Sequence, residues 1–396
     1  MATYLEIDME IVRDNIQIFK NHIGKAKFMA VVKGDAYGHG MVKFAKYIEP
    51  YVDAFGVGVQ KEAVALRVAG IKKPILIMCP YFDNDVVYKY TITPSIDSVD
   101  RLESYEAFLN ELKVRRPYHL MLNTGMNRFG LMPSRIRAFQ HRQLTCDFAY
   151  LEAIYSHFGS NMRQNPIFVR KQLKIFKETF KKISSESKPF LHMANSEVAI
   201  DLEEAHFQMV RVGNGLYGPC YSVKNIGLKK AAKLKTTVID IRRIEKGAYV
   251  GYGATKRLKH NIMAAYIEMG FRDGFEVTRN RSGNGVKGRF KEIVKIILNR
   301  NGKSHLIQYK GSKINVIGKP NMQFIMLDIS RHSQIQLGSI LDVKGSTFFV
   351  DKGIERKYIN IYEAEYDNEK VEEEEVITSS IDDAVAEFQE KKRRDE

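Results

Sequence analysis

The sequence predicts an α/β protein in which a (β/α)8 TIM-type barrel over residues 1–228 precedes a mostly β domain over residues 229–362. Two observations carry this prediction. In the first 228 residues, eight short β-rich runs alternate with segments whose apolar residues recur at helical spacing. After residue 229, β-type runs separated by turn residues replace that alternation. Strands that each lead into a helix favour a parallel barrel wrapped by helices, with an open doubly wound sheet as the alternative.

The expected barrel strands follow one another at intervals that leave room for a helix after each. They are residues 27–32, 54–58, 74–78, 91–96, 118–122, 152–156, 189–193 and 208–212. The fourth is the weakest, because Pro94 has no N–H to donate to a sheet. One of the expected helices begins at Asn165-Pro166, since proline is favoured in the first turn of a helix.

The later residues predict a separate β domain built from the runs 235–244, 262–271, 292–300, 304–311 and 314–319. The first β-type run of the chain is a candidate to pair with this domain. The basic stretch 278–289 is expected to be a hairpin tip. Residues 363–396 hold 14 acidic and 5 basic side chains, so we expect an acidic and mobile tail.

Composition excludes several classes of protein. The formal net charge is +15, and the tail contributes −9, so residues 1–362 carry the remaining +24. The lysines are scattered rather than gathered in one arm, so we expect a solvated basic surface and no nucleic-acid partner. No window is apolar enough for a membrane span, and no secretory leader is evident, which predicts a cytoplasmic protein. Three widely spaced cysteines exclude a disulfide framework and a cysteine-rich zinc site.

Polar residues lie where the predicted barrel strands end, and these carboxyl ends meet at one rim. A lysine ends the first strand, a histidine ends the sixth, and two arginines and an amide-rich turn belong to the same rim. These residues are Lys33, Arg128, His157, Asn195, Ser196, Arg211, Gly213 and Asn214. Together they suit a cofactor that carries a phosphate and an electrophilic carbon.

Lys33 follows the apolar run FMAVV, where desolvation and nearby cations would lower the pKa of its amine and make it a nucleophile. On its own, the same residue is more simply a lysine that extends from a strand end into water. In the following GDAYGHG, Tyr37 is a candidate to bind a phosphate. Gly213-Asn214-Gly215 supplies backbone N–H groups for the same purpose.

Six ordered segments resemble the alanine racemase family. They are AVVKGDAYGHG (30–40), NTGMNRFGL (123–131), YSHFGSN (155–161), HMANSE (192–197), VRVGNGLYGP (210–219) and VGYGATK (250–256). The resemblance extends from the start of the chain to about Asp328. It implies a pyridoxal-phosphate enzyme with a barrel, a β-domain and a head-to-tail homodimer. It also implies an isomerase that makes D-alanine for cell-wall peptidoglycan.

The resemblance implies a role for each motif residue. Lys33 corresponds to the Schiff-base lysine and to one of two acid-base groups. Tyr252 corresponds to the other and would act in the partner's site, with a cationic His157 lowering the pKa of its phenol. Arg211 corresponds to the arginine that faces the pyridine nitrogen, and as a permanent cation it favours racemisation over transamination. The remaining cofactor and substrate contacts would come from Tyr37, Asn195, Ser196, Gly213, Asn214, Arg128 and Met322.

Ser196 has a second expected role, as the N-cap of the helix that starts at SEVAIDLEE.

Several positions depart from the family pattern. Met121 and Asn123 replace a lysine and an aspartate, which leaves Arg128 without the usual anionic brace. Further departures are Phe271, Lys319 and Gln323, and only Tyr358 and Tyr362 are candidates for the family's last phosphate-binding tyrosine. The resemblance therefore supports the catalytic core better than it supports alanine as the substrate.

Three alternatives stay open. The first is a racemase for serine or another amino acid. The second is a decarboxylase of basic amino acids, and the third is a racemase fold retained as a binding protein.

Overall fold

A computed structural model describes residues 3–183, 188–251, 253–254, 256–273, 306–344 and 347–361. It consists of two compact units. One unit contains Met9–Ala231, and the other combines Met1–Asp8 with Ala232–Ile359. The predicted run 292–300, the basic stretch 278–289 and the tail 363–396 lie outside the described residues. No helix within the described residues is long and apolar enough to cross a membrane.

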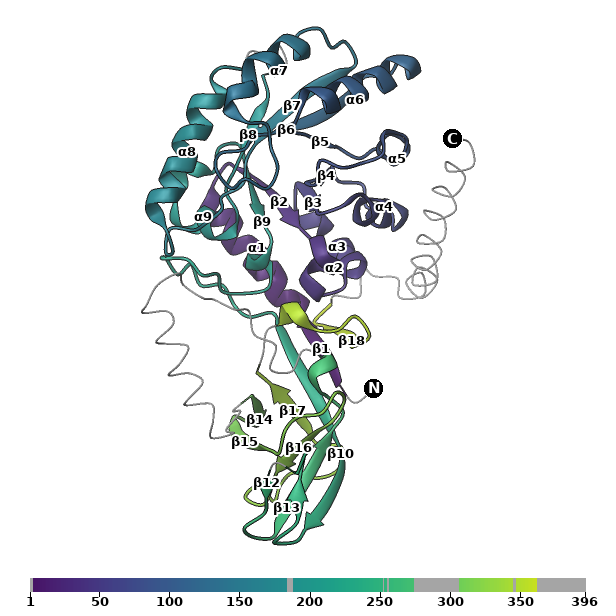
Figure 1. Ribbon diagram of the computed structural model, residues 1–396, viewed down its shortest axis with the longest axis vertical. Coiled ribbons are helices and arrows are strands. Elements are labelled where there is room, and N and C mark those ends of the chain that lie inside the picture. Colours follow the sequence, from purple (N-terminus) through teal and green to yellow (C-terminus); the bar gives the residue numbers. More distant parts are fainter. Residues whose placement is uncertain are drawn as a thin grey trace. The chain divides into compact units, whose positions relative to one another are not determined.

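The first unit is a parallel eight-stranded barrel wrapped by helices (Figure 1). Its strands are β2 (Lys27–Val31), β3 (Ala54–Val57), β4 (Ile75–Ile77), β5 (Ser95–Ile96), β6 (Arg116–Met121), β7 (Ala149–Tyr155), β8 (Phe190–His192) and β9 (Met209–Val212). Each run predicted for this barrel contains or overlaps one of them, so the predicted fold class is confirmed. The main helices are α1 (Met9–Ile23), α3 (Met41–Ile48), α4 (Gln60–Val68), α5 (Asn84–Lys89), α6 (Val99–Leu112), α7 (Ile136–Gln143), α8 (Pro166–Phe180) and α9 (Ser196–Asp201).

The strands pair in the order β4-β3-β2-β9-β8-β7-β6-β5, and a single bridge closes the circle. The bridge joins Leu76 of β4 to Thr93, just before β5. Pro94 interrupts the ladder there, which accounts for a β5 of only two residues. Buried apolar side chains from four strands, Met29, Ala54, Leu76 and Met209, pack together in the barrel.

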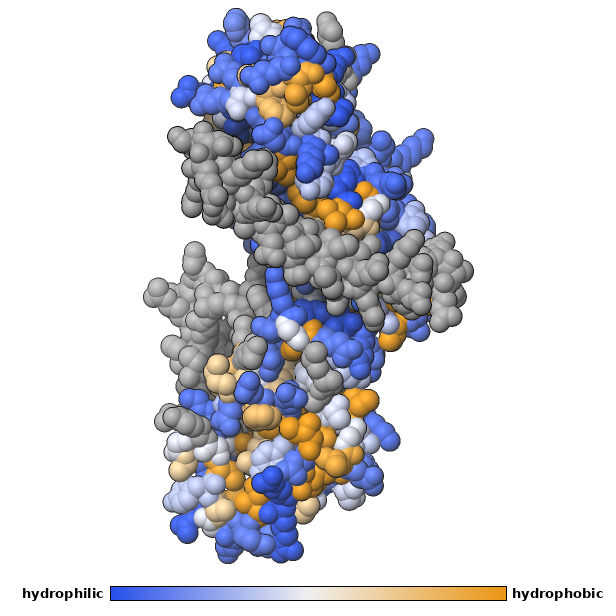
Figure 2. Space-filling view, turned by 90° about the vertical axis from the view of Figure 1, so that its right-hand side faces the viewer, coloured by the Kyte–Doolittle hydropathy of each residue, from blue (hydrophilic) through white to orange (hydrophobic). Residues whose placement is uncertain are grey.

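The second unit is a mostly antiparallel β structure organised around the long strand β10 (Ala232–Ile244). The first half of β10 pairs with β1 (Thr3–Asp8) and β17 (Ile340–Val343), and its second half pairs with β13 (Ile262–Ile267). The remaining strands are β11 (Tyr249–Val250), β12 (Lys256–Arg257), β14 (Ile307–Tyr309), β15 (Ser312–Ile317), β16 (Ile325–Asp328) and β18 (Glu355–Ile359). Strands β1 and β18 form a parallel pair. Figure 2 shows apolar side chains on the surface of this unit, which exposes Met263, Met322, Phe324, Leu337 and Ile340.

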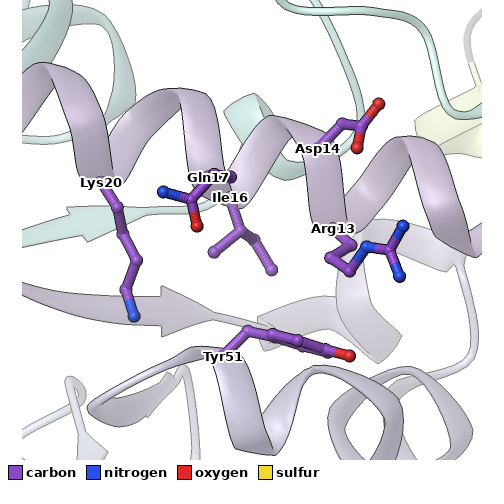
Figure 3. Close-up of a pocket in the computed structure, with 6 residues that line it drawn as sticks. All are labelled: Arg13, Asp14, Ile16, Gln17, Lys20 and Tyr51. Carbon is purple, nitrogen blue, oxygen red and sulfur yellow. The ribbon is translucent and has the colours of Figure 1, made fainter.

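A small pocket of about 180 Å³ lies between α1 and the 3₁₀ turn η1 (Glu49–Tyr51). Figure 3 shows Ile16 and Tyr51 facing each other across it, with Arg13 and Lys20 on either side. Asp14 and Gln17 complete its lining. None of the residues predicted to act chemically lines this pocket, so it is separate from the candidate site.

Candidate active site

The site begins where β2 ends, in a short left-handed turn. In α2 (Lys33–Gly38), Gly34, Asp35, Ala36 and Tyr37 all have φ between 52° and 63°. A left-handed conformation costs an L-residue about 1–2 kcal/mol, so three non-glycine residues in succession store strain that the surroundings must offset. Two carboxylates hold the turn: Glu62 Oε1 accepts from Gly34 N at 2.6 Å, and Asp35 Oδ1 accepts from Met41 N at 2.8 Å.

Lys33 precedes this turn and lies in a partly dry, cationic environment. Burial is the largest cause that lowers the pKa of its amine below the ordinary value, and Arg128 and Arg211 lower it further. The Glu62 carboxylate opposes that shift. The amine is therefore a better nucleophile and proton acceptor near neutral pH than an exposed lysine.

Arg211 is the most strongly held side chain of the site. It is 2% exposed, and it donates from Nη1 to His192 Nδ1 at 2.9 Å and from Nη2 to the carbonyl oxygen of Ser156 at 2.8 Å. Burial lowers its pKa to about 10, which still leaves it protonated at neutral pH. No acceptor for its Nε–H is found among the described residues. That N–H remains a fixed donor for a ligand.

His157 lies beside Arg211, with Nδ1 3.3 Å from Arg211 Nη2. Burial, followed by the charges of Arg211, Lys33 and Arg128, lowers its pKa well below the ordinary value. The expectation of a cationic His157 is therefore wrong. Burial away from water and the three neighbouring basic side chains both disfavour a positive charge on its ring. Since Nδ1 faces the Arg211 guanidinium, which has no acceptor, the proton of the neutral ring belongs on Nε2, and His157 can act as a neutral hydrogen-bond donor.

The predicted phosphate-binding residues come together across α2, α9 and β9. Ser196 Oγ accepts from Gly213 N at 3.0 Å and from Gly215 N at 3.3 Å. Gly213 is required because a Cβ there would lie 2.2 Å from the Tyr37 hydroxyl oxygen. Burial raises the pKa of Tyr37 to about 12, so its hydroxyl keeps its proton and stays a donor.

Asn195, rather than Ser196, is the N-cap of α9, which corrects the cap expected at Ser196. The Asn195 side chain accepts from Val198 N at 3.0 Å. Its amide oxygen is thus used within the helix, and the Ser196 hydroxyl is turned toward the Gly213 loop instead. Asn214, the next residue of that loop, donates from Nδ2 to Glu197 Oε1 at 3.3 Å.

Arg128 is exposed, on a loop that follows β6. The loop is held through its backbone, because Asn123 Oδ1 accepts from Gly125 N at 2.9 Å and from Asn127 N at 3.2 Å. Within the described residues no acidic side chain pairs with Arg128, and Met121 is buried. Asn123 therefore supports the loop without supplying a charge to its arginine.

The remaining predicted residues lie elsewhere. Tyr252 and Tyr362 lie outside the described residues. Met322 belongs to the C-terminal unit, where it is 65% exposed, and Phe271 of the same unit is 37% exposed. Lys319, Gln323 and Tyr358 also belong to the C-terminal unit.

Residue-by-residue reasoning missed three residues: Glu62, which contacts the turn, His192, which contacts Arg211, and His119, which contacts His192. Their signal in the sequence is faint, since each is a single polar residue in or next to an apolar run.

Two family models match the chain. The alanine racemase N-terminal domain matches residues 7–220, and the alanine racemase C-terminal domain matches residues 231–359. Alanine racemase 1 of Clostridium acetobutylicum is 30% identical over 354 residues, which is 87% of this chain and 86% of that protein.

The chain belongs to the alanine racemase family.

Solved structures agree with this membership. Alanine racemase of Clostridium difficile 630 is 25% identical, with a TM-score of 0.75 over 90% of this chain and 88% of that one. Alanine racemase from Bartonella henselae, solved with covalently bound pyridoxal phosphate, has the same TM-score over 91% of this chain and 100% of that one. At 21% identity, the second likeness shows the fold alone.

Proposed function

We propose that this alanine racemase family member is a pyridoxal-phosphate-dependent racemase that interconverts L- and D-alanine. We place it in the cytoplasm as a homodimer that supplies D-alanine for cell-wall peptidoglycan. Family membership supports the reaction class. One observation of this chain carries the proposal furthest: a lysine amine of lowered pKa shares a rim with a fully buried arginine.

The residues present fit the cofactor. Tyr37, Ser196, Gly213 and Asn214 form a cradle of hydroxyl, amide and glycine backbone in which a phosphate would be held. Arg211 offers an N–H that would face the ring nitrogen, and Lys33 supplies the amine for the aldehyde carbon. When bound, pyridoxal phosphate supplies a conjugated ring that draws electrons from the substrate's Cα and makes its proton acidic.

Two bases on opposite faces of Cα account for racemisation. The neutral Lys33 amine would take the proton from one face, or return it there as an ammonium group. Tyr252 of the partner subunit would do the same on the other face. His157 would orient the Tyr252 phenol through its Nε2–H, as a neutral donor and not as a cation.

Arg211 determines which product forms. Its guanidinium keeps its proton at neutral pH, so it would donate a hydrogen bond to the ring nitrogen of a bound cofactor without protonating it. A ring left unprotonated would withdraw less negative charge from the substrate, which would favour return of the proton to Cα. Proton return at Cα gives racemisation, whereas proton delivery elsewhere would give transamination.

Exposed apolar side chains support the homodimer. The rim loops of the barrel leave Tyr81, Met126 and Met132 between 37% and 62% exposed, and the C-terminal unit exposes Met322 and Phe324. Contiguous exposed apolar surface is typical of protein interfaces. A dimer would also let Tyr252 act in its partner's site.

The deciding experiment incubates the purified protein and pyridoxal phosphate with each common L-amino acid, followed by chiral chromatography. D-alanine is expected as the fastest-forming product. Formation of D-serine alone would show that the substrate is serine and not alanine. Release of carbon dioxide from lysine or ornithine without racemisation would replace the proposal with decarboxylation, and no turnover of any amino acid would leave only a binding role.

Borohydride reduction followed by peptide mass spectrometry tests the cofactor separately. The cofactor is expected to become attached at Lys33. A protein that takes up no pyridoxal phosphate would contradict the proposal.

A further inference from the structure

Four polar side chains form an unbroken series of hydrogen bonds through the barrel interior, starting at Arg211. Arg211 Nη1 lies 2.9 Å from His192 Nδ1, and His192 Nε2 lies 3.1 Å from His119 Nδ1. His119 Nε2 then lies 3.0 Å from Glu152 Oε2. These residues belong to β9, β8, β6 and β7 in turn. The first three are at most 4% exposed, whereas the Glu152 side chain is 38% exposed, so the series leads from the buried site toward water.

A β-bulge brings Glu152 into this series. Along β6 and β7, Tyr118 pairs with Leu151 but His119 pairs with Ala153, so Glu152 is an extra residue with no opposite partner. Bulges are rare between parallel strands, and they redirect a side chain. Here the redirected side chain is a carboxylate that contacts a buried histidine.

The charged groups at the two ends of the series, Arg211 and Glu152, fix where every proton lies. An arginine only donates, so His192 Nδ1 must accept, and the ring proton of His192 is on Nε2. His192 Nε2–H then donates to His119 Nδ1, which puts the His119 proton on Nε2. That last N–H needs an acceptor, and an ionised carboxylate only accepts. The series therefore has one consistent direction, from Arg211 to Glu152.

Both histidines are neutral in this arrangement. Burial, together with the charge of Arg211, lowers the pKa of His192 well below its ordinary value. Burial also lowers the pKa of His119, although the bond to Glu152 opposes the shift. Tyr155 stacks on His192 with ring centres 4.7 Å apart, and burial raises its pKa to about 12, so it adds no charge. Among the described residues, Glu152 is the one acid bonded to either ring.

We propose that Glu152 is a positioning residue for Arg211. Its negative charge holds both imidazoles in the Nε2–H tautomer, which keeps His192 Nδ1 as the acceptor that fixes the guanidinium. A neutral side chain that donates at this position would reverse the series and set His192 N–H against Arg211 N–H. The link from Glu152 to cofactor binding rests on the proposed function, whereas the tautomers are a property of the chain itself.

The test compares the full-length protein with its Glu152→Gln and Glu152→Ala variants after ¹⁵N labelling of the 10 histidines. In the unmodified protein, the ¹⁵N spectrum is expected to show His119 and His192 as neutral Nε2–H tautomers between pH 6 and 8. Glu152→Gln keeps the shape but can donate, so a mixture of tautomers is expected. Glu152→Ala removes the acceptor, so the His119 N–H signal should broaden or shift.

A matched control is Glu178→Gln, which neutralises a carboxylate that is 60% exposed on α8. It should leave both ring signals unchanged. Pyridoxal phosphate affinity, measured by fluorescence titration, is expected to fall about 10-fold in Glu152→Ala and to be restored by Glu152→Asp.

Unchanged tautomers in both Glu152 variants, or a cationic His119 in the unmodified protein, would overturn the proposal. Tautomers that shift in a protein without racemase activity would instead contradict the proposed function and leave the role of Glu152 standing.

Discussion

Carboxylates hold backbone amides at both ends of the barrel, but the two ends differ in the cations that lie beside these acids. At the end where the strands begin, buried or half-buried acids accept hydrogen bonds from backbone amides. Glu106 accepts from the amides of Asp147, Phe148 and Ala149 at 2.6–3.3 Å. Glu49 accepts in the same way from the two residues before Pro74.

At the end where the strands finish, Glu62 and Asp35 accept from backbone amides in the same way, and positively charged side chains gather beside them. Lys33, Arg128, Arg211 and the neutral His157 share this rim, and Glu62 is the acid that raises the pKa of the lysine. The backbone there also holds the left-handed turn of α2. Both ends thus fix backbone segments with acids, and the carboxyl end in addition accepts electrostatic and backbone strain to keep cations available for an anionic ligand.

Lys33→Ala should show most clearly that the carboxyl-end rim supports activity rather than the stability of the fold. Racemase activity is expected to fall about 10³-fold or more in both directions, because the variant loses the amine for the cofactor and one proton carrier. The free energy of unfolding should stay the same or rise, because a partly buried amine no longer has to be desolvated. Chiral assays and urea denaturation measure the two effects.

Lys61→Ala is the matched control, since Lys61 is an exposed lysine on α4. It should change neither quantity appreciably. A Lys33→Ala protein that is much less stable than the parent would show that the lysine supports the fold rather than the chemistry.

Mild acid should weaken the barrel through its neutral histidines. His157 and His192 have pKa values well below the ordinary 6.5 in the folded state, so below pH 6.5 the unfolded chain binds protons that the folded chain does not. The contribution of these two neutral histidines to the free energy of unfolding is therefore fully present above pH 6.5, and it decreases as the pH falls. At pH 5.5 the two rings together are expected to cost about 3 kcal/mol.

Urea denaturation at pH 7.5 and pH 5.5 measures this loss. A His157→Asn variant should lose about 1.5 kcal/mol less stability than the parent between the two pH values. Equal losses in the variant and the parent would show that His157 titrates normally in the folded protein.

Much of this organisation was predictable from short segments of sequence. Buried parallel strands are continuous apolar runs, so their positions were found, and Pro94 marked the weakest of them. Lys33 and Arg211 were found for the same reason, because a charged residue in or beside an apolar run stands out. The sequence resemblance added their roles.

Contacts between distant parts of the chain could not be predicted in this way. Glu106 and Ala149 are 43 residues apart, and Gly34 and Glu62 are 28 apart. The partnership of His119 with Glu152 depends on a register shift between two strands, which no local pattern records. The neutral state of His157 depends on three cations and on burial, so residue type alone suggested the wrong charge.

Glu106→Gln tests the end where the strands begin. The variant keeps one acceptor but places an NH₂ group against a backbone N–H, so the free energy of unfolding should fall by about 2 kcal/mol. Activity per folded molecule should not change, because the residue is remote from the rim chemistry. Glu111→Gln, an exposed position on the same helix, is the control and should leave stability unaltered.

The smallest expected effect concerns Asn123, which anchors backbone amides of the carboxyl-end rim through an uncharged side chain. Asn123→Ala removes its bonds to Gly125 N and Asn127 N, so the Arg128 loop should loosen at a cost of about 1 kcal/mol. KM for alanine is expected to rise about fivefold with little change in kcat, since a binding side chain is displaced and no proton carrier is touched. Asn123→Asp preserves the oxygen that accepts both bonds and should keep KM near that of the parent. If both variants raised KM equally, the backbone anchor would not be what positions Arg128, and the asparagine would act through its amide N–H₂ instead.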